Sequence, residues 1–447
     1  MMSELKKELR QIDVWGLAFG AIIGTGCFFL PGTKFLPLSG PLGMVIGILI
    51  GTVMILIIGI NYSYLIQQFP QAGGEYIFVR KNLGKSHSFL CGWFLLLAYI
   101  LLVPLNSTSV SMILRYLTPG LLEKGKIYNV AGWDVYPAEI LVTSLIIVIL
   151  TWINVVGVKF AGYIQTVLAL ILAVCVFVGA VAAAISGVTI SNLRPAFAGE
   201  NKIECVLATL AISPFLFIGF DCIPQASEEY KFPHSKTLKI MFLAIIFAAL
   251  TYITVALLTG VVMPWREMLN QNHSWVTGAA IEYKFGKPGI LLLGTAMICS
   301  SLAGINAFLL SSARLLYAMA GDKIIPPVLG KVDSKRHIPV NAIVSVAVIS
   351  LIAPWFGREV LNWIVEMSSV GGALVYGYSS FITFIIAKQK KSKKYGLCGI
   401  AGTIFSVCFL VLLLFPGLSS SLSREALIAL VIWSLLGILI WFWVKGT

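Results

Sequence analysis

Twelve apolar runs of about 20 residues dominate this sequence. A helix of about 20 apolar residues crosses the roughly 30 Å hydrocarbon core of a bilayer. Only 11% of the 447 residues are charged, whereas a soluble domain has about a quarter. The chain is therefore predicted to be an all-α membrane protein. The expected spans are 12–36, 41–66, 88–117, 136–156, 160–187, 203–229, 238–262, 288–318, 339–356, 360–387, 397–416 and 425–444.

The placement of basic residues predicts how the spans are oriented. Lys and Arg gather in alternate connecting segments, as in "KQKKSKK" at 388–394, whereas the acidic residues divide nearly evenly. This pattern predicts a multi-pass protein of the plasma (inner) membrane with both termini in the cytoplasm. The net charge of +13 then favours contact with anionic lipid, and no nucleic-acid partner is expected. The eight cysteines and four histidines show no metal-ligand spacing, so we expect no metal and no other cofactor.

Two of the expected spans are interrupted near their centres. The first carries "AIIGTGCFFLPG" at 21–32, and the sixth carries "SPFLFIGFDCIPQASEEY" at 213–230. Glycine and proline are the poorest helix formers, and both segments contain them. The breaks lie five spans apart, so the two units would have opposite orientations in the membrane. This spacing predicts an inverted repeat of five plus five helices, with units at 1–187 and 188–395 and two further helices at 396–447.

A helix break at membrane depth is useful because it frees backbone groups. The half-helix after a break presents N–H groups with a partial positive charge, and the half-helix before it presents carbonyls. Such backbone is tolerated in a membrane where it lines a cavity. An amino acid zwitterion needs donors for its carboxylate and acceptors for its ammonium group. The paired breaks therefore predict an amino acid site, and the alternative is that Gly24 and Gly26 form a close-packing face between helices.

Acidic residues mark two further candidate sites. Asp221 lies in the second break, and a carboxylate at mid-membrane costs about 2.5–3.5 kcal/mol. It is a candidate for proton coupling, and a structural role that bonds the freed backbone is an equal alternative. Glu228 and Glu229 follow near the cytoplasmic side as candidates for an inner gate. Their expected partners are Arg80, Lys81, Lys231 and Lys236. The polar stretch 67–86, which contains Arg80 and Lys81, is expected to form a short helix or a re-entrant segment.

Four motifs together resemble the amino acid–polyamine–organocation (APC) permease superfamily. They are "GAIIGTGCFFLPG", "FPQAGGEYIFVRKNLG", "FIGFDCIPQASEEYKFP" and "SSARLLYAMAGD", in that order along the chain. The "GFD" of the sixth span is most similar to the bacterial branch that resembles cationic amino acid transporters. The resemblance implies twelve transmembrane helices with the first and sixth discontinuous, an inverted repeat and alternating access.

The resemblance also implies which residues bind the substrate. The backbone N–H groups of Thr25, Gly26 and Cys27 would hold the carboxylate. The carbonyls of Ile22, Ile23 and Ile218 would accept from the ammonium group. Phe215 and Phe220 would form an aromatic gate, and Phe308 would line the side-chain pocket. These assignments rest on the family motif as it matches residues 22–27, 215–220 and 308. Apart from the resemblance, Gly24 and Gly26 would keep the first break free of side chains so that backbone N–H groups can hold a carboxylate, and Gly219 is a further candidate in the second break.

The resemblance leaves the mode of coupling open. Some proton-coupled members carry a lysine in the fifth span, where this chain has leucine and isoleucine at 170–172. No hydroxyl can be assigned to a sodium site either. We expect a secondary transporter of neutral, apolar amino acids that works by proton symport or by exchange, with a proton favoured over sodium. Alternatives are an exchanger of cationic amino acids or polyamines, a channel, and a membrane-embedded enzyme. The enzyme is disfavoured because no histidine lies inside a span.

Overall fold

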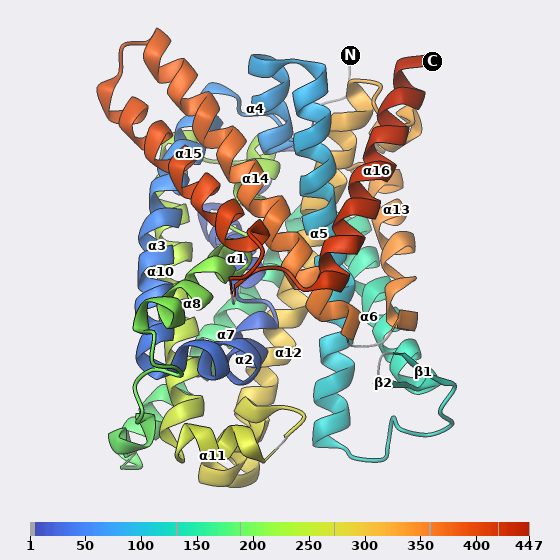
Figure 1. Cartoon of the computed structure of the whole chain (residues 1–447). Helices are drawn as coiled ribbons and strands as arrows, with labels where there is room; N and C mark the ends of the chain where they lie inside the picture. Colours follow the sequence, from blue (N-terminus) through green and yellow to red (C-terminus); the bar gives the residue numbers. More distant parts are fainter. Residues whose placement is uncertain are drawn as a thin grey trace.

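The computed structural model describes residues 5–130, 133–187, 189–271, 273–356, 359–418 and 420–446. These residues form a bundle of long helices, with both termini at one end (Figure 1). The α-helices are α1 (Gln11–Ile23), α2 (Gly26–Leu30), α3 (Leu36–Gln68), α4 (Gly74–Leu83), α5 (Lys85–Leu117), α6 (Pro137–Val156), α7 (Val158–Ile185), α8 (Lys202–Phe217), α9 (Cys222–Gln225), α10 (Thr237–Val261), α11 (Trp265–Asn270), α12 (Val276–Gly321), α13 (Val340–Ser350), α14 (Glu359–Gln389), α15 (Lys393–Leu414) and α16 (Arg424–Gly446).

Short elements complete the chain. A π-helical turn at Pro31–Phe35 joins α2 to α3, and 3₁₀ turns occupy Ile190–Leu193, Ser227–Glu229, His234–Lys236, Pro327–Gly330 and Ala353–Phe356. Strands β1 (Tyr128–Val130) and β2 (Trp133–Val135) pair antiparallel in a small hairpin. This hairpin and α11 lie at the end of the bundle opposite the termini (Figure 1).

The helices confirm a multi-pass membrane protein. Ten segments of the described chain are long and apolar enough to span a bilayer, and the first of them, Gln11–Gln68, contains two of the expected spans. The expected ninth span corresponds to a shorter apolar segment, Val340–Phe356. Helix α12 changes direction at Gly286, so its membrane portion begins close to the expected residue 288. The polar stretch before α5 forms the short helix α4, as expected.

Both interruptions expected from the sequence are present. Helix α1 ends at Ile23 and α2 begins at Gly26, and α8 ends at Phe217 and α9 begins at Cys222. Helix α1 packs against α7, α10 and α12, and it also touches both α8 and α9. The two interrupted helices are therefore neighbours at the centre of the bundle.

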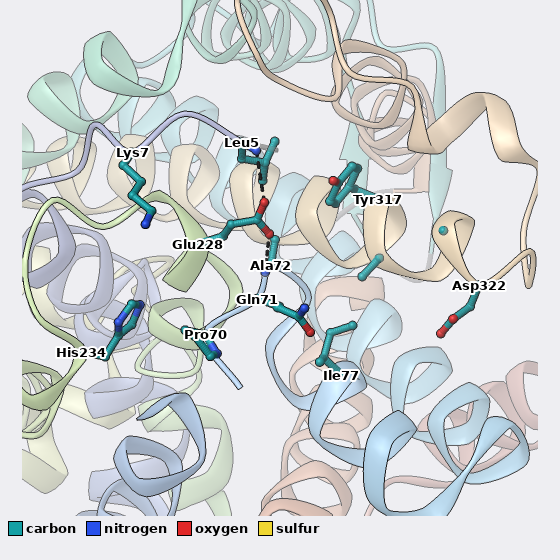
Figure 2. Close-up of a pocket in the computed structure, with 12 residues that line it drawn as sticks. Leu5, Lys7, Pro70, Gln71, Ala72, Ile77, Glu228, His234, Tyr317 and Asp322 are labelled. Carbon is teal, nitrogen blue, oxygen red and sulfur yellow. Dashed lines mark hydrogen bonds between the residues drawn. The ribbon is translucent and has the colours of Figure 1, made fainter. Parts of the chain in front are cut away.

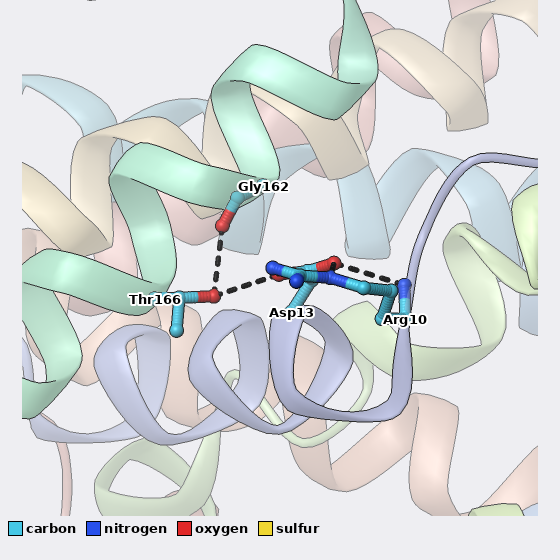
Figure 3. Close-up of polar contacts among 4 residues, drawn as sticks. All are labelled: Arg10, Asp13, Gly162 and Thr166. Atoms are coloured by element: carbon cyan, nitrogen blue, oxygen red, sulfur yellow. Dashed lines mark hydrogen bonds and ion pairs between the residues drawn. The ribbon is translucent and has the colours of Figure 1, made fainter.

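The start of α1 is anchored to α7 by a polar cluster (Figure 3). Arg10 Nε donates to Asp13 Oδ2 at 2.9 Å, and the Arg10 backbone N–H donates to the same oxygen. Thr166 of α7 donates through its hydroxyl to Asp13 Oδ1, also at 2.9 Å, and to the carbonyl of Gly162. This cluster satisfies the backbone N–H of Arg10 at the helix start and fixes α1, which carries the first break, against its neighbour.

Candidate functional site

The backbones of the two breaks are in direct contact. A methyl group added at Gly219 would lie 2.5 Å from the backbone nitrogen of Ile22 and 2.7 Å from the carbonyl carbon of Ala21. Gly219 also has a φ of +128°, which side-chain-bearing residues rarely adopt. Only glycine meets both conditions, so this residue allows the second break to reach the first.

The N-terminus of α2 carries a freed N–H group that already has a side-chain partner. Gly24 has a φ of +42° and ends α1, which turns the chain into α2. The N–H of Thr25 donates to Oδ1 of Asn106, a residue of α5, at 3.0 Å. Asn106 is 2% exposed, so this hydrogen bond is shielded from water. The group expected to hold a substrate carboxylate is thus held by an amide oxygen of the protein.

The carbonyls at the end of α1 also have a side-chain partner. The hydroxyl of Tyr252, on α10, donates to the carbonyl oxygen of Ile22 at 3.1 Å, with Ile23 O at 3.4 Å. These are the carbonyls expected to accept from a substrate ammonium group. Asn106 and Tyr252 thus satisfy the Thr25 N–H and the Ile22 carbonyl that the first break leaves free.

A small cavity of about 20 Å³ lies between these groups. Eight of the predicted site residues line it: Ile22, Ile23, Gly24, Thr25, Gly26, Phe215, Ile218 and Phe308. Asn106 and Tyr252 line it as well, together with Leu102, Leu105 and Ala21. The space holds about one water molecule. An amino acid therefore requires the lining side chains to move.

Three predicted site residues lie beside the cavity without lining it. Among the described residues around it, Cys27, Gly219 and Phe220 are not part of the wall. Phe220 instead packs against the rings of Tyr62 and Tyr376, with centroid distances of 5.1 and 5.3 Å. Of the two aromatic residues expected to form a gate, the structure thus brings only Phe215 to the cavity wall.

Asp221 is fully buried and bonds the backbone of its own break. Its Oδ1 accepts from the N–H of Gly219 at 2.6 Å, and its backbone carbonyl accepts from the hydroxyl of Tyr99 at 3.1 Å. Within the described chain, Asp221 Oδ2 has no hydrogen-bond partner. The structural role considered for this residue is therefore present, and one oxygen remains available for a proton.

The terminus-bearing end of the bundle contains a second, larger cavity of about 500 Å³ (Figure 2). Glu228 lies at its wall and accepts hydrogen bonds from the N–H groups of Leu5 at 3.1 Å and Ala72 at 3.0 Å. The carbonyl of Glu229 accepts from the N–H groups of Glu8 and Leu9. The N-terminal segment is thereby tied to the chain that leaves the second break.

The inner-gate candidates have partners other than those expected from the sequence. Glu229 pairs with Arg314 of α12 at 2.8 Å, and both side chains are about 1% exposed. Arg80 pairs with Asp322 at 2.9 Å, and the ammonium group of Lys81 lies over the ring of Phe69. The expected partners were cations near in sequence, Lys231 and Lys236, or in the polar stretch before α5, whereas folding brings α12 against this end. Burial raises the pKa of Glu229, and the guanidinium of Arg314 opposes that rise.

Sequence reasoning missed three residues of this region. Asn106 is a polar residue within an apolar span, which was a usable signal. Tyr252 gave none, because tyrosine is common in such spans. Glu75 lies in the polar stretch expected at the membrane surface, yet it is fully buried. Burial raises the pKa of its carboxyl well above the usual 4.5, and the nearby Asp221 adds to the rise.

Comparisons with known proteins identify the family of this chain. A family model described as amino acid permease matches residues 9–440. The branched-chain amino acid permease BcaP of Bacillus subtilis is 25% identical over an alignment of 463 positions that covers 98% of this chain and 93% of that protein. Cationic amino acid transporter 4 of Mus musculus is 25% identical over 89% of this chain. Large neutral amino acids transporter small subunit 2 of Homo sapiens is 25% identical over 78%. The chain spans about three fifths of the latter two, 62% and 64% of their lengths.

The bundle of long apolar helices makes this a multi-pass membrane protein, and the family match makes it a permease, not an enzyme. The chain belongs to the amino acid permease family of the APC superfamily. It is thus an amino acid transmembrane permease, and its substrate and mode of coupling are matters for proposal.

Proposed function

We propose that this protein is a secondary active transporter that moves neutral, apolar amino acids across the plasma membrane by alternating access. The observation that carries the proposal is that two backbone groups at the first break are hydrogen-bonded to the side chains of Asn106 and Tyr252. Thr25 N–H and the Ile22 carbonyl face one cavity, and each is bonded by a side chain that a substrate can replace. A carboxylate would replace the Asn106 oxygen, and an ammonium group would replace the Tyr252 hydroxyl.

The lining of the cavity supports a neutral substrate. Its walls are mainly Ile, Leu, Phe, Ala and Gly, and Asp221 is not among the described lining residues. Asp221 is instead committed to the N–H of Gly219. Two relatives named above, a branched-chain amino acid permease and a large neutral amino acids transporter subunit, favour the same substrate class.

Alternating access would use the arrangement proposed from the sequence. Units 1–187 and 188–395 would form an inverted repeat around the two breaks, and residues 396–447 would add two helices. The terminus-bearing end would face the cytoplasm, where Glu228, Glu229, Arg80 and Lys81 would form the inner gate. In this scheme the bonds of the N-terminal segment to Glu228 and Glu229 keep that end closed.

The second candidate is an exchanger of cationic amino acids or polyamines, which the similarity to a cationic amino acid transporter supports. The variant Asp221→Asn separates the two, because asparagine keeps the oxygen that accepts from Gly219. Continued uptake of leucine with altered pH dependence supports the neutral-substrate proposal with Asp221 as a proton site. Selective loss of arginine or spermidine transport supports the exchanger.

Countertransport in proteoliposomes tests the proposal itself. Vesicles loaded with unlabelled leucine should accumulate labelled leucine without an imposed ion gradient, because a carrier returns with substrate bound. Steady ion conductance without countertransport would identify a channel instead. Repeating the assay with proton and sodium gradients distinguishes symport from exchange.

A further inference from the structure

Glu75, at the start of α4, is a second buried carboxyl next to the broken helix. Its Oε2 accepts a hydrogen bond from Nε2 of Gln225 at 2.6 Å. Gln225 ends α9, one helical turn after Asp221, so a single turn of helix connects the two acids. Glu75, Gln225 and Asp221 are all fully buried.

This cluster has more acceptors than donors. In the described chain, Glu75 Oε1, Asp221 Oδ2 and Gln225 Oε1 have no hydrogen-bond partner, and neither does the hydroxyl of Tyr62. The first three atoms can only accept while the acids are ionised, and Tyr62 can donate once. Buried polar groups without partners are costly, so the arrangement calls for further donors. A proton on either carboxyl converts an acceptor into a donor.

The titratable groups around Glu75 also favour a proton on its carboxyl. Asp221 and Cys222 approach from the broken helix, Tyr62 from α3, Cys91 and Tyr99 from α5, and Tyr376 from α14. None of these groups is a cation. On α4 itself, Arg80 is committed to Asp322, and on α12, which also packs against α4, the buried Arg314 is committed to Glu229. Burial and the charge of Asp221 both raise the pKa of Glu75.

Packing around the cluster leaves little room for a metal ion. A methyl group added at Gly74 would lie 2.7 Å from Nε2 of Gln225, and one added at Gly73 would lie 2.3 Å from the side chain of Ala318. Because a bound proton needs no added volume, it fits this packing better than a coordinated cation. Ala72 and Ile77, on either side of the start of α4, line the 500 Å³ cavity at the terminus-bearing end. Glu75, three residues after Ala72 and two before Ile77, is therefore close in the chain to a space from which a proton can arrive.

We propose that Glu75 is a second proton-binding site, held against the broken helix by Gln225, and that it shares with Asp221 one proton that is bound and released in each transport cycle. This inference rests on the transport activity proposed above.

The test compares Glu75→Gln with wild type in proteoliposomes, using labelled leucine and labelled arginine as probes. Glutamine keeps the size of the side chain and an oxygen that accepts from Gln225. Wild-type uptake should change about tenfold per pH unit on its steep limb, as a single-proton step requires. The variant should lose most of this slope and the accompanying proton influx. The matched control is Glu425→Gln, an exposed glutamate at the start of α16, which should behave as wild type.

A second variant makes the test independent of Glu75→Gln. Gln225→Met removes the donor that stabilises the ionised carboxylate, so it should raise the pKa of Glu75 and move the pH midpoint of uptake upward. Any of three results would overturn the proposal. Uptake by Glu75→Gln could keep the pH slope of wild type, or wild-type uptake could be independent of pH. Uptake could also require sodium in a way that depends on Glu75. Failure of the underlying transport function is recognised separately, because wild type itself would then transport neither probe at any pH.

Discussion

Oδ1 of Asn106 lies 3.0 Å from the backbone nitrogen of Thr25, in the position that a substrate carboxylate would need. This contact gives the freed N–H group of the first break a partner within the protein. In the proposed function, substrate binding would exchange this hydrogen bond for another. The net gain in binding free energy per exchange is then small, and selectivity depends on charge and on the fit of the substrate side chain.

The variant Asn106→Asp tests this exchange. It preserves the shape and the acceptor of the side chain but places a negative charge where the substrate carboxylate should lie. Like charges in contact cost several kcal/mol, so leucine affinity should fall more than tenfold. The measurement is the leucine concentration that gives half-maximal thermal stabilisation of the purified protein. Unchanged leucine binding would show that Asn106 is remote from the carboxylate.

Tyr252→Phe tests the other half of the site. Loss of the hydroxyl removes a buried hydrogen bond to the Ile22 carbonyl, which should lower stability by about 1 kcal/mol. Leucine affinity should stay the same or increase, because the ammonium group no longer competes with the hydroxyl. Melting temperature and leucine titration together measure both effects. Loss of leucine binding would instead make Tyr252 a direct ligand of the substrate.

The buried pair between Arg314 and Glu229 should be strongly coupled. Arg314→Met leaves Glu229 buried without its cation, which costs about 3–5 kcal/mol. The double variant with Glu229→Met removes the stranded charge and should recover most of that loss. Thermal melting of the two single variants and the double variant gives the coupling energy. Additive losses would mean that the pair contributes no specific stability.

Stability should depend on pH through Glu75. Its folded-state pKa lies above the usual 4.5, so the folded protein binds this proton more tightly than the unfolded chain. The stabilisation is present in full below pH 4.5 and is lost as the pH rises through the folded-state pKa. The melting temperature of wild type should therefore fall with rising pH more steeply than that of Glu75→Gln. Parallel curves for the two proteins would contradict the burial of an ionisable Glu75.

Much of the fold could be predicted because spans and breaks are local features of the sequence. Apolar runs mark the helices, and the glycines and prolines around Gly24 and Gly219 mark where α1 and α8 end. The backbone part of the site followed from these breaks and from the family motif. The side-chain partners did not, because Asn106 and Tyr252 come from helices whose packing no local pattern specifies.

The same limit explains the incorrect pairing at the terminus-bearing end. Glu229 was expected to meet a cation near it in sequence or in the loop at 80–81, but its partner Arg314 lies 85 residues further along the chain. Likewise, Phe220 was expected at the substrate, whereas the turn at Gly219 directs it toward Tyr62 and Tyr376. Sequence spacing predicted which elements meet at the centre, and only the packed structure shows which side chains face each other.

Space at the first break is the central requirement of the proposed function. A methyl group added at Gly26 would lie 3.2 Å from the Phe215 ring and 3.3 Å from the Tyr252 hydroxyl. Gly26→Val should therefore fill the 20 Å³ cavity and abolish transport while the protein still reaches the membrane. Gly179→Val is the control, because a side chain there meets no atom within 4 Å.

The most direct measurement is a thermal-shift titration of the purified wild-type and Gly26→Val proteins against the twenty amino acids and common polyamines. A ligand that binds only the folded state raises the melting temperature by mass action. We predict that at least one neutral amino acid stabilises wild type and the Gly179→Val control, and that none stabilises Gly26→Val. If no amino acid stabilises wild type, or if Gly26→Val is stabilised as strongly as wild type, the paired breaks are a packing face and not an amino acid site.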